Sequence, residues 1–171
     1  ASGGLLLSFL SSFDVGDYVG LATPGYPAYK NMLMALGIKV IEIPVDYKSN
    51  FQLTSEILDK HSHERLDGLI ISSPSNPTGS MISSSNLNNL VDWCAAREVR
   101  LISDEIYHGI VYGEPASTSL SYSKNSIVIN SFSKYFSMTG WRLGWMIVPQ
   151  DMLRAVECLA QNLFISPPTL S

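Results

Sequence analysis

Short apolar runs recur along the chain, and longer segments with helical spacing of apolar residues separate them. Continuous apolar runs are typical of strands that are buried on both faces, as in a parallel sheet covered by helices. The pattern therefore predicts an α/β fold with a mostly parallel central sheet and helices on both faces. The strand runs lie at 19–22, 69–72, 100–103 and 127–130.

The intervening segments predict the helices. Residues 5–13 are apolar around most of a helical wheel, which indicates a buried helix. Leu87, Leu90, Val91 and Cys94 follow the i, i+3, i+4, i+7 spacing of an amphipathic helix. A further helix is expected after 23–29, with an apolar face of Tyr29, Leu33 and Leu36. Two more are expected at 51–60, capped by Thr54, and from the N-cap Asp151 to Leu163. Further strands are expected at 39–45 and at 144–148, and the second of these is expected to be buried.

Composition narrows the class of protein. A chain of 171 residues that is 46% hydrophobic can build the core of one domain. Its formal charge of -4 leaves no broad basic surface for nucleic acid or anionic lipid, so neither is expected as a partner of this segment. Cys94 and Cys158 form no metal or CxxC spacing, and no apolar run approaches the ~20 residues of a membrane span. We expect a cytoplasmic protein with reduced thiols.

The ends of the chain indicate a piece of a longer protein. Ala1 stands where a Met would begin a complete chain, and residues 167–171 follow the last helix without a closing element. His61 and His63, two apart at a polar helix end, suit no metal pair, so no metal site is expected.

The segment 130–145, NSFSKYFSMTGWRLGW, carries the main candidate chemistry. Lys134 follows Ser131 and Ser133 and precedes Arg142 by eight residues, between two predicted strands, so hydroxyls and a guanidinium could hold an anion beside an amine. A lysine in a loop is more often a solvated charge. Ser131 to Lys134 also spells the S-x-x-K motif of serine β-lactamases, but the chain lacks the S-D-N and K-T-G partners of that motif.

Other candidates follow strands or open helices. Ala1–Ser2 precede a buried helix whose free N–H groups could bind phosphate, although Ser2 could simply be an N-cap. Tyr26 could stack on a planar ring or belong to the core. Asn76 lies in the proline-rich turn 74–79. Asp104 ends an apolar strand and needs a cation or donors, or else caps the next turn. Parallel strands end at one edge, where these residues could converge.

These motifs together resemble the class I/II aminotransferases of fold type I, which use pyridoxal 5′-phosphate (PLP). The resemblance rests on the lysine segment, N-P-T-G at 76–79, Asp104 with Tyr107 three residues later, and Tyr26 after a strand, all in family order. It covers nearly all of the chain but only the middle of the family's fold. It implies that residues 1–171 form part of a PLP-binding large domain, with an N-terminal segment and a C-terminal small domain absent.

The resemblance also implies a role for each candidate. Lys134 would form a Schiff base with PLP and then move a proton between the substrate Cα and C4′; burial and nearby positive charge would favour its neutral amine. Asp104 would keep the pyridine nitrogen protonated, Asn76 and Tyr107 would contact the 3′-oxygen, and Tyr26 would cover the ring. The implied catalytic residues are Lys134, Asp104 and Tyr107, and the implied phosphate anchors are Ala1, Ser2, Ser131, Ser133 and Arg142.

The implied function is transfer of an amino group between an amino acid and a 2-oxo acid, by a protein that is a homodimer at full length. Two alternatives stay open: a PLP-dependent carbon–sulfur β-lyase, and an aminotransferase-like sensor domain of a transcription regulator. The family binds the substrate carboxylate from the C-terminal small domain, so this segment leaves the substrate open, and we expect it to turn over poorly alone.

Overall fold

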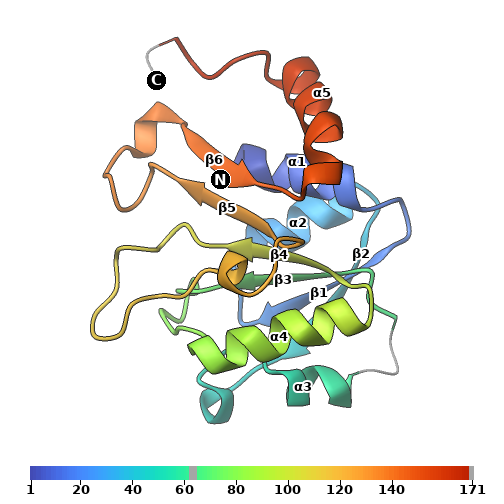
Figure 1. The fold of residues 1–171 in the computed structure, drawn as a ribbon, viewed down its shortest axis with the longest axis vertical. Coiled ribbons are helices and arrows are strands. Elements are labelled where there is room, and N and C mark those ends of the chain that lie inside the picture. Colours follow the sequence, from blue (N-terminus) through green and yellow to red (C-terminus); the bar gives the residue numbers. More distant parts are fainter. Residues whose placement is uncertain (62–64, 170–171) are drawn as a thin grey trace.

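A six-stranded sheet forms the centre of the molecule (Figure 1). The computed structural model describes residues 1–61 and 65–169, so His63 lies outside the described residues. The strand order is β2-β1-β3-β4-β5-β6, with every neighbouring pair parallel except β5 and β6. This confirms the predicted fold class. The strands are β1 (Tyr18–Thr23), β2 (Lys39–Pro44), β3 (Gly68–Ser72), β4 (Arg100–Asp104), β5 (Ile127–Ser131) and β6 (Gly144–Ile147).

Helices cover both faces of this sheet (Figure 1). Alternate strand residues point to opposite faces. Leu69 and Leu101 accordingly pack in the core with α3 and α4, whereas Ile70 and Ile102 pack in a second core with α1, α2 and α5. The apolar runs are continuous because each face needs its own layer. The helices are α1 (Ser2–Ser12), α2 (Pro27–Ala35), α3 (Ser55–Lys60), α4 (Ser84–Ala96) and α5 (Leu153–Leu163).

Two helix starts follow from side-chain caps. The Thr54 hydroxyl accepts a hydrogen bond from the Ile57 N–H, and Ser83 caps α4 in the same way. Helix α3 therefore begins after Thr54 rather than at residue 51. The prediction that Asp151 caps the last helix is wrong, because Asp151 lies within a 3-10 turn, Gln150–Met152, that precedes α5.

The prediction of a buried strand after the lysine segment is also wrong. β6 is an edge strand that pairs only with β5 among the described residues, and it runs antiparallel to it. Trp145 and Ile147 are 39% and 44% exposed. An apolar run predicts burial, but a strand with a neighbour on one side only leaves part of that surface open.

The order of the strands decides where a site can form. The chain moves from β1 outward to β2 and then returns to the other side of β1 for β3, which makes the β1–β3 boundary a topological switch point. Ligands of open α/β sheets bind at the carboxyl edge near such a point. Within the described part of the chain, no helix has the length and apolarity that crossing a membrane requires. Cys94 is buried and Cys158 half-buried, and both are free thiols.

Candidate functional site

A cavity of about 290 Å³ opens at the carboxyl edge of the sheet. It lies where the start of α1, the loops after β1 and β3, the end of β4 and the lysine loop (residues 132–143) meet. The sequence singled out most of its polar lining. Of the predicted site residues, the cavity wall includes Ala1, Ser2, Tyr26, Asn76, Asp104, Tyr107, Ser133, Lys134 and Arg142.

Ser131 is the predicted residue that does not line the cavity. It is 1% exposed, at the end of β5, and its Oγ accepts a hydrogen bond of 2.9 Å from the Ser133 N–H. This contact fixes the first turn of the lysine loop, so the observed position of Ser131 is behind the cavity wall. Its predicted contact with phosphate stays a prediction.

The cavity wall includes a buried carboxylate. Asp104, the last residue of β4, is 4% exposed. Its Oδ2 accepts a hydrogen bond of 2.7 Å from the Tyr29 hydroxyl, and its Oδ1 accepts one of 3.2 Å from the Ile106 N–H. Burial raises the pKa of Asp104, while these two hydrogen bonds act in the opposite direction. A cationic N–H placed beside this carboxylate would relieve its desolvation.

Tyr29 is a site residue that the sequence patterns had assigned to the apolar face of a helix. Burial, followed by the negative charge of Asp104, raises the pKa of Tyr29 well above its ordinary value, so the hydroxyl remains a donor. The signal that could have found it is spacing: Tyr29 lies three residues after Tyr26 and therefore on the same side of the start of α2. The two rings pack edge to face with centroids 5.4 Å apart.

Beside the carboxylate lie an amide, a phenol and an amine. Asn76 donates a hydrogen bond of 3.5 Å from Nδ2 to the Tyr107 hydroxyl, although they are 31 positions apart. The Nζ of Lys134 lies 5.8 Å from the centroid of the Tyr107 ring. Lys134 is exposed at the mouth of the cavity, so the expectation that this side chain is buried is wrong for this chain. The lysine loop follows an edge of the sheet, which leaves this side chain open to solvent.

The start of α1 and Arg142 give the cavity groups that suit an anion. The first N–H groups of a helix have no acceptor within the helix, and α1 turns this end toward the cavity at Ala1 and Ser2. Arg142 lines the same cavity and donates from Nη1 to the Thr139 carbonyl at 2.8 Å. Gly144 permits this arrangement, because a Cβ there would lie 3.1 Å from the Ala1 nitrogen and 2.7 Å from the Asn130 carbonyl oxygen.

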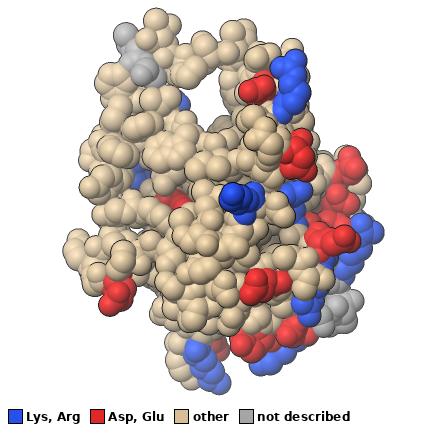
Figure 2. Space-filling view, viewed as in Figure 1, with Lys and Arg blue, Asp and Glu red and all other residues tan. Residues whose placement is uncertain are grey.

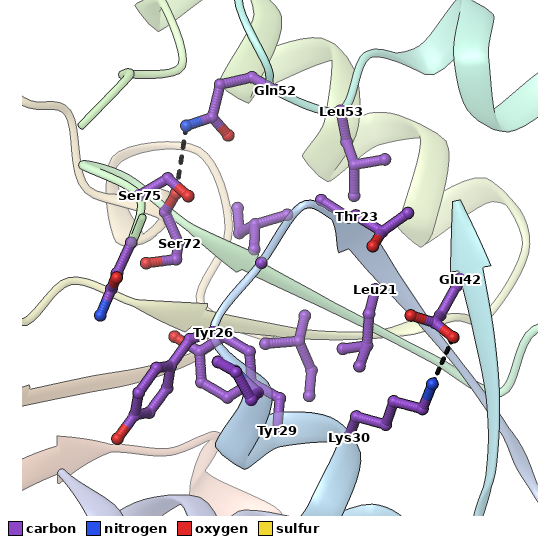
Figure 3. A pocket seen from close by; sticks show the side chains of 16 residues that line it. Leu21, Thr23, Tyr26, Tyr29, Lys30, Glu42, Gln52, Leu53, Ser72 and Ser75 are labelled. Carbon is purple, nitrogen blue, oxygen red and sulfur yellow. Dashed lines mark hydrogen bonds and ion pairs between the residues drawn. The ribbon is translucent and has the colours of Figure 1, made fainter. Parts of the chain in front are cut away.

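A second cavity of about 170 Å³ lies beside the first, at the β1–β3 boundary (Figure 3). Tyr26, Tyr29 and Asn76 line both cavities and so form the wall between them. Figure 3 shows Lys30 paired with Glu42 on one side and Gln52 bonded to the Ser72 carbonyl on the other. The Lys30 amine is thus already paired with a carboxylate.

The sequence profile of the family described as "Aminotransferase class I and II" matches residues 1–171. The chain belongs to this aminotransferase family. Members of the class I/II aminotransferases are typically PLP-dependent. The sheet, with its single antiparallel strand, also matches solved aminotransferases.

Individual relatives agree with this assignment. The chain is 51% identical to valine–pyruvate aminotransferase of Mycobacterium tuberculosis over 173 aligned residues, covering 100% of this chain and 44% of the relative. A solved aminotransferase from M. tuberculosis matches with a TM-score of 0.94 and 50% identity, over 99% of this chain and 46% of that one. A Thermus thermophilus aspartate aminotransferase mutant matches with a TM-score of 0.93 and 27% identity, over 99% and 47%. The chain thus spans less than half the length of these relatives.

Proposed function

We propose that the protein carrying this chain is a PLP-dependent aminotransferase, which moves an amino group between an amino acid and a 2-oxo acid. The main support is that the buried carboxylate of Asp104, at the end of β4, lines one cavity together with Lys134 and Arg142 of the lysine loop. Family membership supports the reaction class.

The donor set of the cavity fits PLP. The buried carboxylate of Asp104 would accept from the cationic ring nitrogen, and this pairing would offset the desolvation that raises the pKa of Asp104. Asn76 and Tyr107, already hydrogen-bonded to each other, would both reach the 3′-oxygen. Tyr26 would cover the ring. The phosphate would bind between the start of α1 and the lysine loop. Its direct contacts would be Ala1, Ser2, Ser133 and Arg142, and Ser131 would be a further anchor.

Lys134 would supply the reactive amine. PLP, when bound, supplies a ring that accepts the electrons left by the substrate Cα–H bond. Lys134 would bond covalently to the cofactor until the substrate replaces it, and its free amine would then carry the proton away from the substrate Cα. A position at the mouth of the cavity lets the amine reach both a cofactor inside and a substrate that enters from solvent.

The chain would be part of the large, cofactor-binding domain of a homodimer. Its share of each relative, 44% of the first, supports a longer parent protein. An exposed apolar patch around the lysine loop supports an interface, because contiguous apolar surface usually marks one. Figure 2 shows few charged atoms on the upper-left part of this face, where Figure 1 places the segment between β5 and β6. The patch contains Tyr135, Phe136, Trp145 and Ile147.

The experiment is an amino-transfer assay on the full-length protein with PLP. Valine and pyruvate are the first pair to test, because they name the reaction of the relative that is 51% identical. Formation of alanine and 2-oxoisovalerate would support the proposal, and Lys134→Ala should abolish it. Lys124→Ala, in the loop before β5, is the matched control and should keep full activity.

Three other results would refute the proposal that the protein is an aminotransferase. Ammonia and pyruvate released from a cysteine conjugate, without amino transfer to any 2-oxo acid, would show a β-lyase. Tight PLP binding without turnover of any amino acid would show a sensor domain. No PLP binding by the folded protein would remove the cofactor itself.

A further inference from the structure

The loop after β4 leaves the sheet directly beside the site and returns to it before β5. Asp104 ends the strand, and Tyr107 lies in the first turn outside it. The position of both groups therefore depends on how this loop, residues 105–119, is held. The side chain that holds it is not in the cavity wall.

Glu105 points away from the cavity, to the opposite face of the sheet. Leu101 packs on the α3–α4 face and Ile102 on the other, so strand alternation places Asp104 on the cavity side and Glu105 on the α4 side. Glu105 is 3% exposed. A buried carboxylate is costly unless donors surround it, so its partners indicate why it is there.

The carboxylate of Glu105 joins the two ends of the loop. Its Oε1 accepts hydrogen bonds of 3.0 Å from the Ser103 hydroxyl, the Thr118 hydroxyl and the Ser119 N–H. Ser103 belongs to β4, whereas Thr118 and Ser119 form the returning end of the loop. The Oε2 faces His108 Nδ1 at 3.5 Å. A single side chain thus contacts the strand, the first turn and the return.

The backbone around Glu105 is tied to the lysine strand as well. The Glu105 N–H donates to the Ile129 carbonyl of β5 at 2.9 Å. Gly109, with φ +88°, packs so closely on the Tyr135 ring that a Cβ there would lie 2.5 Å from it. The turn that follows Asp104 and carries Tyr107 therefore also contacts the residue next to Lys134.

We propose that Glu105 is a positioning residue of this site: by fixing both ends of the loop after β4, its carboxylate sets where Asp104 and Tyr107 stand relative to Lys134. This inference rests on the proposed function, since the groups it positions are those assigned to PLP. A hydrogen-bonded carboxylate suits the task because its oxygen can accept from several directions, and charge-assisted bonds are stronger than neutral ones.

The test uses the full-length protein with Glu105→Leu, Glu105→Gln and, as a matched core control, Leu58→Ala. Leu58, 1% exposed on α3, is buried in the α3–α4 core. Gln keeps an oxygen that can accept the same three donors, whereas Leu keeps only the volume. Without cofactor, amide hydrogen exchange of residues 105–121 should rise in Glu105→Leu and stay near the wild-type rate in Glu105→Gln.

With cofactor, Glu105→Leu should bind PLP roughly tenfold to a hundredfold more weakly, as expected when buried donors lose a charged acceptor. The visible absorption band of the bound cofactor should also shift, because its contacts with Asp104 and Tyr107 change. Glu105→Gln should restore most of both. Leu58→Ala should lower the melting temperature without shifting the band.

The outcomes separate this inference from the proposed function. If wild-type protein binds no PLP, the proposed function fails. If wild type binds PLP and Glu105→Leu keeps the same affinity, band and exchange rates, the role of Glu105 is refuted while the function stands. If Leu58→Ala reproduces every change of Glu105→Leu at equal loss of stability, Glu105 is only a core residue and the inference is likewise overturned.

Discussion

The hydrogen bond from Tyr29 to Asp104 offers the sharpest prediction about the site. Both side chains are buried, at 7% and 4% exposure, and the hydroxyl lies 2.7 Å from Oδ2. Tyr29→Phe removes only the hydroxyl, so the ring still fills its space and no cavity forms. What changes is that a buried carboxylate oxygen loses its donor.

The magnitude follows from that loss. A hydrogen bond to a charged group contributes about 1.5–3 kcal/mol, and an unsatisfied buried acceptor carries its desolvation cost. Tyr29→Phe should therefore lower the free energy of unfolding by about 1.5–3 kcal/mol, and the pKa of Asp104 should rise further because one of the bonds opposing its increase is gone. The same loss should weaken PLP binding by roughly tenfold or more, because less of Asp104 is ionised.

The assay is urea unfolding together with PLP titration of the full-length protein. Tyr18→Phe is the matched control: its hydroxyl accepts from Lys39 at 3.0 Å on the surface at the start of β1, so its loss should change stability by less than about 0.5 kcal/mol. Unchanged stability and PLP affinity in Tyr29→Phe would show that the Tyr29 hydroxyl does not stabilise the ionised carboxylate of Asp104.

Three further predictions concern charge, phosphate and packing. Without PLP, the pKa of Asp104 is higher in the folded state than in the unfolded state, where it is about 3.9. The folded protein therefore binds the carboxyl proton of Asp104 more tightly than the unfolded chain does. The stabilisation that comes from this proton is thus complete below pH of about 3.9 and is lost as pH rises through the pKa of the folded state. Urea unfolding at a series of pH values should show a smaller fall in the free energy of unfolding for Asp104→Asn than for the wild type. Arg142→Ala should weaken binding of PLP roughly tenfold to a hundredfold but leave binding of pyridoxal, which lacks phosphate, unchanged in parallel titrations. Gly68→Ala would drive a Cβ into the buried Phe13 ring and should cost about 1–3 kcal/mol in urea unfolding, whereas Gly140→Ala, with open space around it, should be nearly neutral.

Most of the fold could be predicted from the apolar pattern. Buried parallel strands leave continuous runs, and the caps at Thr54 and Ser83 use side-chain chemistry that is local in sequence. β6 was mispredicted because an apolar run does not say whether a strand has a neighbour on each side. Asp151 was mispredicted because an acidic residue before a helix suits a 3-10 turn as well as a cap.

The site residues also fall into those that the sequence could predict and those that it could not. Residues at strand ends, such as Asn76 and Asp104, could be predicted to converge because parallel strands end at one edge. The partners that hold them could not, since Tyr29 and Glu105 reach their positions through contacts over 75 and 14 residues of sequence. The exposure of the Lys134 side chain could not be predicted from the sequence either, because it depends on which residues pack around the lysine loop rather than on the motif.

Covalent mapping can show directly whether Lys134 is the residue that holds the cofactor. The full-length protein is mixed with PLP, reduced with borohydride, digested and analysed by mass spectrometry, beside Lys134→Ala. If Lys134 holds the cofactor, a phosphopyridoxyl group should appear on the peptide that contains Lys134 and should be absent from the corresponding peptide of the variant. Modification of Lys30 in the neighbouring cavity instead, or no modification of the folded protein, would contradict it.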